Sequence, residues 1–171
     1  MNYVSEQSPD GVKLLISVLV RYPQIGTVSF DSDTNSLKFT FIISNLLPAE
    51  EAAFIKEIIT SSIDSYHSLL QMNKKTAVLD IYSYEGVSML TVTRDVSTLS
   101  CGEITLIVDI LREHFEGALA SDLPEEMTGS EEGFINDEII ENILKNVRKQ
   151  SDTNRSLIGV REDGRVFVFN K

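Results

Sequence analysis

The sequence predicts an α+β protein in which two strand–strand–helix units form one antiparallel sheet faced by helices. A strand pair within Val28–Ile43 precedes a helix at about Ala49–Leu70, and a pair within Ala77–Thr93 precedes a helix at about Gly102–Gly117. Apolar residues alternate with polar ones in the strand pairs and recur every three or four residues in the helices. A helix before these units and a helix plus hairpin after them complete the predicted order.

The first helix is predicted by its start, its periodicity and its end. Ser8-Pro9-Asp10 combines a capping hydroxyl, a proline in the first turn and an early acid. Pro23 ends the apolar periodicity that follows. Turn-forming residues fill Asp31–Ser36, so the strands on either side are predicted to form an antiparallel hairpin.

The second unit carries similar local signals. Pro48 begins the long helix, with Glu50 and Glu51 near its positive end. The next two strands are joined at Glu85-Gly86, which fits a two-residue hairpin turn. Ser100–Glu103 matches a capping box, in which each side chain satisfies a free backbone donor of the other residue.

Three segments are predicted along the chain: a core domain at residues 1–120, an acidic linker at 121–133, and an appendage at 134–171. The linker is rich in glycine and glutamate and poor in apolar residues. The appendage holds a helix at about Asp137–Lys149 and a hairpin turning at Asp163-Gly164. Because it is too short to stay folded alone, it should dock on the core or on a second protomer.

Charge and cysteine content limit the function classes. The net charge is −11, but residues 145–171 alone hold seven basic and three acidic side chains. The acidic body should repel nucleic acid, which is not an expected partner, whereas the basic tail can attach to an anion. A single cysteine excludes an internal disulfide, and the apolar run Leu14–Val20 is too short to span a bilayer. No membrane partner and a cytoplasmic location are therefore expected.

Cys101 is the sharpest candidate for catalysis. It lies in the predicted first turn of a helix, where the helix dipole favours a reactive thiolate. A nucleophile also needs a base, and neither His67 nor His114 lies in a recognisable motif. We interpret Cys101 as a buried structural residue and both histidines as half-buried packing residues.

No metal or cofactor site is expected. Asp31, Asp33 and Asn35 imitate the start of a calcium-binding loop, but Ser36 stands where glycine is needed and Ile42 where a bidentate glutamate belongs. The glycines form no phosphate-binding loop. Glutamates at 125, 126, 131 and 132 lie in a predicted solvated linker, which cannot separate their pKa values as acid–base catalysis requires. No catalytic, cofactor-binding or metal-ligating residue is therefore assigned.

The terminal hairpin supplies the candidate partner contacts: Arg161, Arg165, Phe167 and Phe169. The two arginines flank the tight turn and suit an acidic partner, and the two phenylalanines share one strand face. We expect a non-enzymatic protein-binding module, chaperone-like or a regulatory adaptor, that forms a homodimer. The alternatives are a thiol-dependent enzyme that uses Cys101 and a basic-tail adaptor for an anionic partner.

Residues 9–119 resemble the type III secretion chaperone-like fold, a group that includes the YbjN-like family. The resemblance rests on the order helix, hairpin, helix, hairpin, helix and on local segments: Phe39–Ile43 leading into Leu47–Glu50, then Tyr84–Gly86 and Leu99-Ser100. It implies an acidic, dimeric, non-enzymatic protein that holds partly unfolded clients, and it carries over no catalytic residue. The family's third strand before the middle helix is not found in this sequence, and the terminal helix and hairpin are additional.

Overall fold

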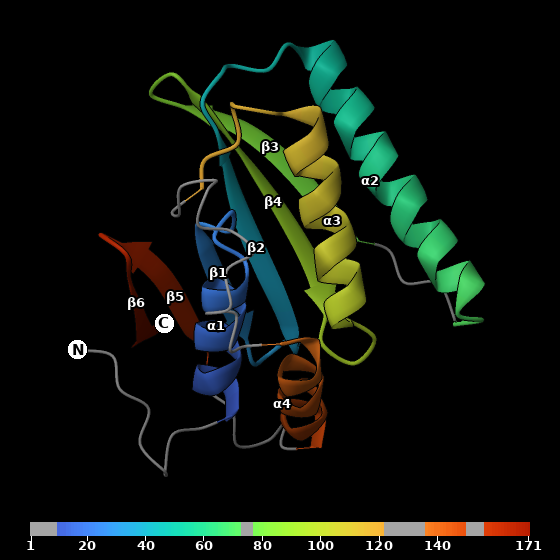
Figure 1. Cartoon of the computed structure of the whole chain (residues 1–171), viewed down its shortest axis with the longest axis vertical. Coiled ribbons are helices and arrows are strands. Elements are labelled where there is room, and N and C mark those ends of the chain that lie inside the picture. Colours follow the sequence, from blue (N-terminus) through green and yellow to red (C-terminus); the bar gives the residue numbers. More distant parts are fainter. Residues whose placement is uncertain (1–9, 73–76, 122–135, 150–155) are drawn as a thin grey trace.

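The computed structural model describes residues 10–72, 77–121, 136–149 and 156–171. Within these ranges, four helices cover a six-stranded antiparallel sheet with strand order β3-β4-β2-β1-β5-β6, which confirms the predicted fold class (Figure 1). The elements are α1 (Asp10–Arg21), β1 (Thr27–Asp31), β2 (Ser36–Ile43), α2 (Ala49–Leu69), β3 (Val78–Tyr84), β4 (Val87–Asp95), α3 (Cys101–His114), α4 (Asp137–Lys149), β5 (Leu157–Glu162) and β6 (Arg165–Asn170). The described helices include none that is both long and apolar enough to cross a membrane.

The three hairpins turn at residues whose backbone is left-handed. Asn35 has a φ of 55° in the β1–β2 turn, and the two strands pair as the predicted antiparallel hairpin. Glu85 and Gly86 have φ values of 49° and 86°, and Asp163 and Gly164 have 54° and 76°. Two successive positive φ angles define the type I′ turn that matches the natural twist of a hairpin.

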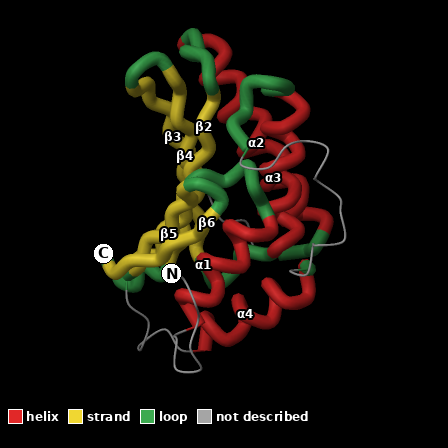
Figure 2. Tube along the Cα trace, turned by 60° about the vertical axis from the view of Figure 1, so that its left-hand side comes forward, coloured by secondary structure: helices red, strands yellow, loops and turns green. Residues whose placement is uncertain are grey.

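The two strand–strand–helix units join through their second strands. β2 pairs with β4 along its whole length, from Ser36 opposite Asp95 to Ile43 opposite Ser88. All described helices lie on one face of the sheet, and the opposite face carries no described helix (Figure 2). The core therefore lies in one layer between the sheet and the helices, and alternate strand residues project away from it.

The third helix ends earlier than its sequence pattern predicts. α3 stops at His114 instead of Gly117, because Gly117 adopts a φ of 82° and the chain turns back toward the sheet. The backbone N–H of Ser44 then donates to the Ala118 carbonyl at 2.9 Å, and that of Ala120 donates to the Ile42 carbonyl at 2.9 Å. Backbone pairing beside β2 thus ends the helix.

The terminal helix and hairpin pack on the core of the same chain. Ile140, Leu144 and Val147 of α4 are completely buried and belong to the main hydrophobic cluster. β5 pairs with β1, from Thr27 opposite Val160 to Phe30 opposite Leu157. A Cβ at Gly159 would lie 3.0 Å from Leu19 Cδ1, so the missing side chain lets β5 approach α1. The linker at residues 122–133 and the helix start at Ser8-Pro9 lie outside the described residues.

Candidate functional site

A buried network of charged side chains joins α2, β4 and α3. Arg94, Glu103 and His67 have almost no solvent-exposed surface. The Arg94 guanidinium donates from Nε to Glu103 Oε2 and from Nη2 to Glu103 Oε1, the latter at 2.9 Å. His67 Nε2 lies 2.9 Å from the same Oε1. Each of the three elements thus supplies one member, and the carboxylate is held from two sides.

His67 Nε2 lies between two charged partners, 2.9 Å from Glu103 Oε1 and 3.2 Å from Arg94 Nη2. It can donate to the carboxylate in one tautomer or accept from the guanidinium in the other. His67 Nδ1 has no hydrogen-bond partner among the described residues. This histidine is fully buried, so its interpretation as a half-buried packing residue is wrong. The His114 side chain is 26% exposed and packs edge-on against Phe115, as that interpretation predicts, and its Nε2 lies 3.3 Å from Glu51.

Asp95 extends the network to the loop before α3. Burial alone would raise its pKa, but hydrogen bonds from Ser97 and Thr98 and the charge of Arg94 outweigh that effect and lower the pKa to about 2. Arg94 Nη2 also donates to Thr98 Oγ1 at 3.1 Å. Because the central triad lacks solvent access, we assign these residues to holding the loop and α3 in place.

The predicted capping box is half correct. Ser100 Oγ accepts from the Glu103 backbone N–H at 3.2 Å, as expected. The Glu103 side chain turns inward to Arg94 and His67 instead of returning to Ser100. A different free donor of this helix start, the Cys101 backbone N–H, donates to Glu141 of α4 at 2.7 Å. The start of α3 is therefore completed from the terminal helix.

Cys101 is buried beside Tyr22, not beside a histidine. Its Sγ lies 2.9 Å from the Tyr22 hydroxyl and 3.3 Å from Asp137 Oδ1. Burial raises the thiol pKa; the Tyr22 hydrogen bond opposes this and Asp137 adds to it, giving a pKa of about 11. The surroundings thus hold the protonated thiol, which supports the structural interpretation of Cys101.

Cys101 is expected to react slowly with iodoacetamide at pH 8, where a thiol with a pKa of about 11 is almost entirely protonated. The measurement is the alkylation rate of the native protein compared with the same protein in denaturant, where the thiol is exposed. Equal rates in the two states would show an accessible, activated thiol and would contradict this assignment.

Two cations of the basic tail are engaged with the backbone of the core. Arg148 Nε donates to the Val96 carbonyl at 2.9 Å, and its Nη2 donates to the Leu99 carbonyl. Arg161 Nη2 lies within 2.6–3.0 Å of the carbonyl oxygens of Leu19, Tyr22 and Ile25, where α1 ends. Arg161 was a candidate partner contact, but the structure shows that it binds the backbone of its own chain.

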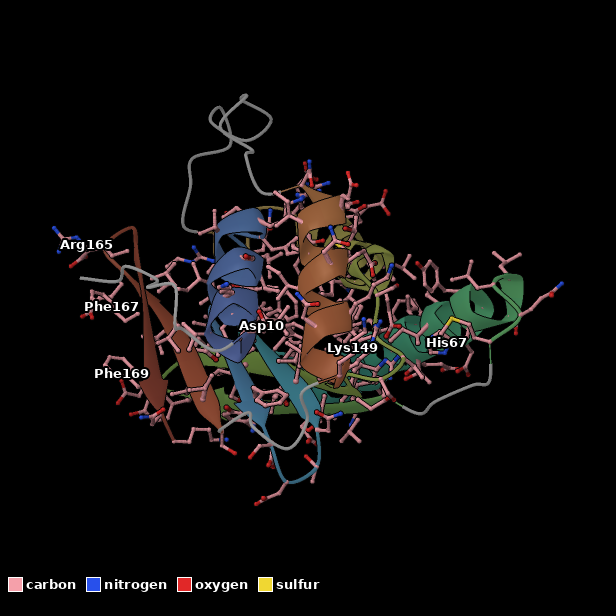
Figure 3. All side chains as sticks on the ribbon, turned by 90° about the horizontal axis from the view of Figure 1, so that it is seen from below. Asp10, His67, Lys149, Arg165, Phe167 and Phe169 are labelled. Carbon is pink, nitrogen blue, oxygen red and sulfur yellow. The ribbon has the colours of Figure 1, made fainter. Side chains whose placement is uncertain are left out.

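The other three candidate residues of the hairpin lie at the surface. Phe167 and Phe169 project from β6 on the side away from α1 and α4, as does Arg165 (Figure 3). The two rings stack with centroids 6.4 Å apart, and Phe169 is 54% exposed. Ile158 lies opposite Phe169 and Val160 opposite Phe167 on β5, so four apolar side chains gather on the uncovered face.

This group of Ile158, Val160, Phe167 and Phe169, here called the hairpin patch, forms one end of the uncovered face. The strands next to it carry small polar residues on that face, including Ser29 opposite Ile158 and Thr27 opposite Val160. At the far edge, β3 exposes Val78, Tyr82 and Tyr84. The hairpin patch and the side chains of β3 thus lie at opposite edges of this face, and Thr27 and Ser29 border the patch.

Two further features of the described residues bear on ligand binding. The described residues contain no group of three or more potential metal-ligating side chains. A hollow of about 290 Å³ near the start of β1 is at the lower limit for ligand pockets. Among the described residues lining it, the charged side chain is Arg161, which is bonded to α1.

The hairpin patch is thus the candidate binding surface, and sequence reasoning identified both of its aromatic residues. The buried network around Glu103 was missed.

The resemblance to the secretion chaperone-like fold stays a prediction. A scan of protein-family models and searches of curated proteins and solved structures find no match to this chain.

Proposed function

We propose that this protein is a non-enzymatic protein-binding module, chaperone-like or a regulatory adaptor, that recognises an extended segment through the hairpin patch and the free edge of β6. The observation that carries the proposal is the uncovered sheet face, with Phe167 and Phe169 at its edge. Exposed aromatic side chains are frequent anchors of protein interfaces.

The edge position of β6 supports strand addition as the binding mode. β6 is the last strand of the described sheet, so one side of its backbone has no strand partner there. An extended peptide can pair with such an edge and place alternate side chains on the patch. Arg165 and Lys171 flank the strand and are both exposed, which favours acidic residues in the bound segment.

The partner chemistry is therefore a strand with aromatic or aliphatic residues at alternate positions and acidic residues among them. The homodimer expected from the sequence stays a prediction.

A display library of linear peptides, selected on the whole protein, tests this function. We expect selected peptides to alternate apolar and polar residues, to carry net negative charge, and to lose affinity for a Phe167→Asp/Phe169→Asp variant. Loss of an aromatic anchor typically costs about 2 kcal/mol, or about thirtyfold in affinity.

Leu69→Asp is the matched control, because Leu69 is 82% exposed in the last turn of α2. Figure 3 shows His67 of the same turn far from the hairpin. Thermal unfolding of both variants checks that each remains folded. Peptides that bind the hairpin variant as tightly as the unmodified protein would refute the proposed site.

A further inference from the structure

The chain itself contains a strand with the chemistry that the hairpin patch should select. β3 lies at the opposite edge of the sheet and reads Val78-Leu-Asp-Ile-Tyr-Ser-Tyr84. Its residues on the uncovered face are Val78, Asp80, Tyr82 and Tyr84, all exposed. We propose that β6 of one copy pairs with β3 of a second copy, which extends the sheet from molecule to molecule; this inference rests on the proposed function.

Strand direction allows this pairing without rearrangement. Neighbouring strands of the sheet are antiparallel throughout, and five such pairings lead from β3 at one edge to β6 at the other. β6 therefore runs antiparallel to β3. A second copy placed beside the first in the same orientation continues the alternation across the junction.

The backbone groups of both edges also match. In a two-residue hairpin, the residues that flank the turn bond to each other, so the next residue along each strand directs its N–H and C=O outward. Tyr84 and Val87 flank one turn, and Glu162 and Arg165 flank the other. Ser83 and Ile81 of β3, and Val166 and Val168 of β6, therefore present the outward groups. These residues lie on the helix-covered face of both strands, as opposite residues of one sheet must.

One register pairs both charge and aromatic character. Placing Asp80 opposite Lys171 of the second copy brings Tyr82 opposite Phe169 and Tyr84 opposite Phe167. Opposite charges and aromatic pairs directly across two strands are both stabilising. The Tyr82 and Phe169 side chains are each about half exposed in the single chain, so the contact would cover them.

The charges on the two edge strands favour pairing of β6 with β3 over pairing of two β6 strands or two β3 strands. Residues 78–87 hold Asp80 and Glu85 and no basic residue, whereas residues 165–171 hold Arg165 and Lys171 and no acidic residue. Two β6 edges would bring cations together, and two β3 edges would bring acids together, which is unfavourable. A contact between different edges is open-ended and adds copies as concentration rises.

Sedimentation velocity of the whole protein over a wide range of concentrations tests the inference. We expect the average mass to rise continuously with concentration. Asp80→Lys and Lys171→Asp should each weaken association about tenfold, because each replaces an attractive cross-strand pair by a repulsive one. The double variant, and an equal mixture of the two single variants, should regain it, since both then restore opposite charges across every junction.

Two results would overturn the inference: a monomer at every concentration, or a discrete dimer that neither single variant weakens. Neither would touch the proposed function, because peptide selection on the hairpin patch is measured separately. If selected peptides still lose affinity for the Phe167→Asp/Phe169→Asp variant while self-association is absent, the binding site stands and the second copy is not its partner.

Discussion

Replacing Glu103 with alanine is expected to lower the free energy of unfolding by about 3–5 kcal/mol, because it leaves a buried guanidinium without its counter-ion. Arg94 and Glu103 are both removed from solvent, and Arg94 directs two nitrogen donors at this one carboxylate. His67 would lose the same polar neighbour. Urea-induced unfolding, followed by circular dichroism, measures the change.

The matched control is Glu113→Ala, on the exposed side of the same helix. It removes an equal charge and should change stability by no more than about 0.5 kcal/mol. The double variant Arg94→Met/Glu103→Leu removes both buried charges, and we expect it to be clearly more stable than Glu103→Ala, because a buried ion pair replaced by apolar side chains is often neutral. If Glu103→Ala lowers the free energy of unfolding no more than Glu113→Ala does, the charges around Glu103 are already hydrated in the native protein, which would contradict this prediction.

The local pattern of the sequence was sufficient to predict the helices and strands, but not the buried network of Arg94, Glu103 and His67. α4 was predicted at its observed bounds, because helical spacing is a local property of the sequence. Glu103 matched a capping box, which is also local, yet its carboxylate turns to a strand and another helix.

A signal for this network was present in β4. Leu90, Val92 and Arg94 occupy successive positions on the helix-covered face, so the alternation places a cation in an apolar row. A charge at such a position calls for a buried partner of opposite sign. The sequence does not identify that partner, because Glu103 follows after a loop whose path depends on the fold.

The hairpin residues show the same difference between local properties, which the sequence predicts, and contacts that depend on the fold. Phe167 and Phe169 were placed correctly on one strand face, since alternate residues share a face wherever the strand lies. Arg161 was grouped with Arg165 because both flank the turn, but they lie on opposite faces of the hairpin. Only the position of β5 beside β1 and α1 brings Arg161 to the carbonyls at the end of α1.

Leu144→Ala in α4 is expected to destabilise the whole protein by about 2–5 kcal/mol, because it leaves a cavity in the shared core. Leu144 is completely buried and belongs to the same cluster as the residues of α1 and α3. Glu141 and Arg148 also tie α4 to the start of α3 and the loop before it. Unfolding followed by circular dichroism should therefore remain a single transition, with its midpoint shifted to a lower urea concentration.

Ile139→Ala is the control for this substitution, since Ile139 is on the same helix but 37% exposed. It should lower the free energy of unfolding clearly less than Leu144→Ala does. The comparison also decides where the terminal unit docks. If α4 packed on a second protomer, the effect of Leu144→Ala would depend on protein concentration, because mass action would link folding to association. A loss of stability that is the same at all concentrations requires that α4 complete the core of its own chain.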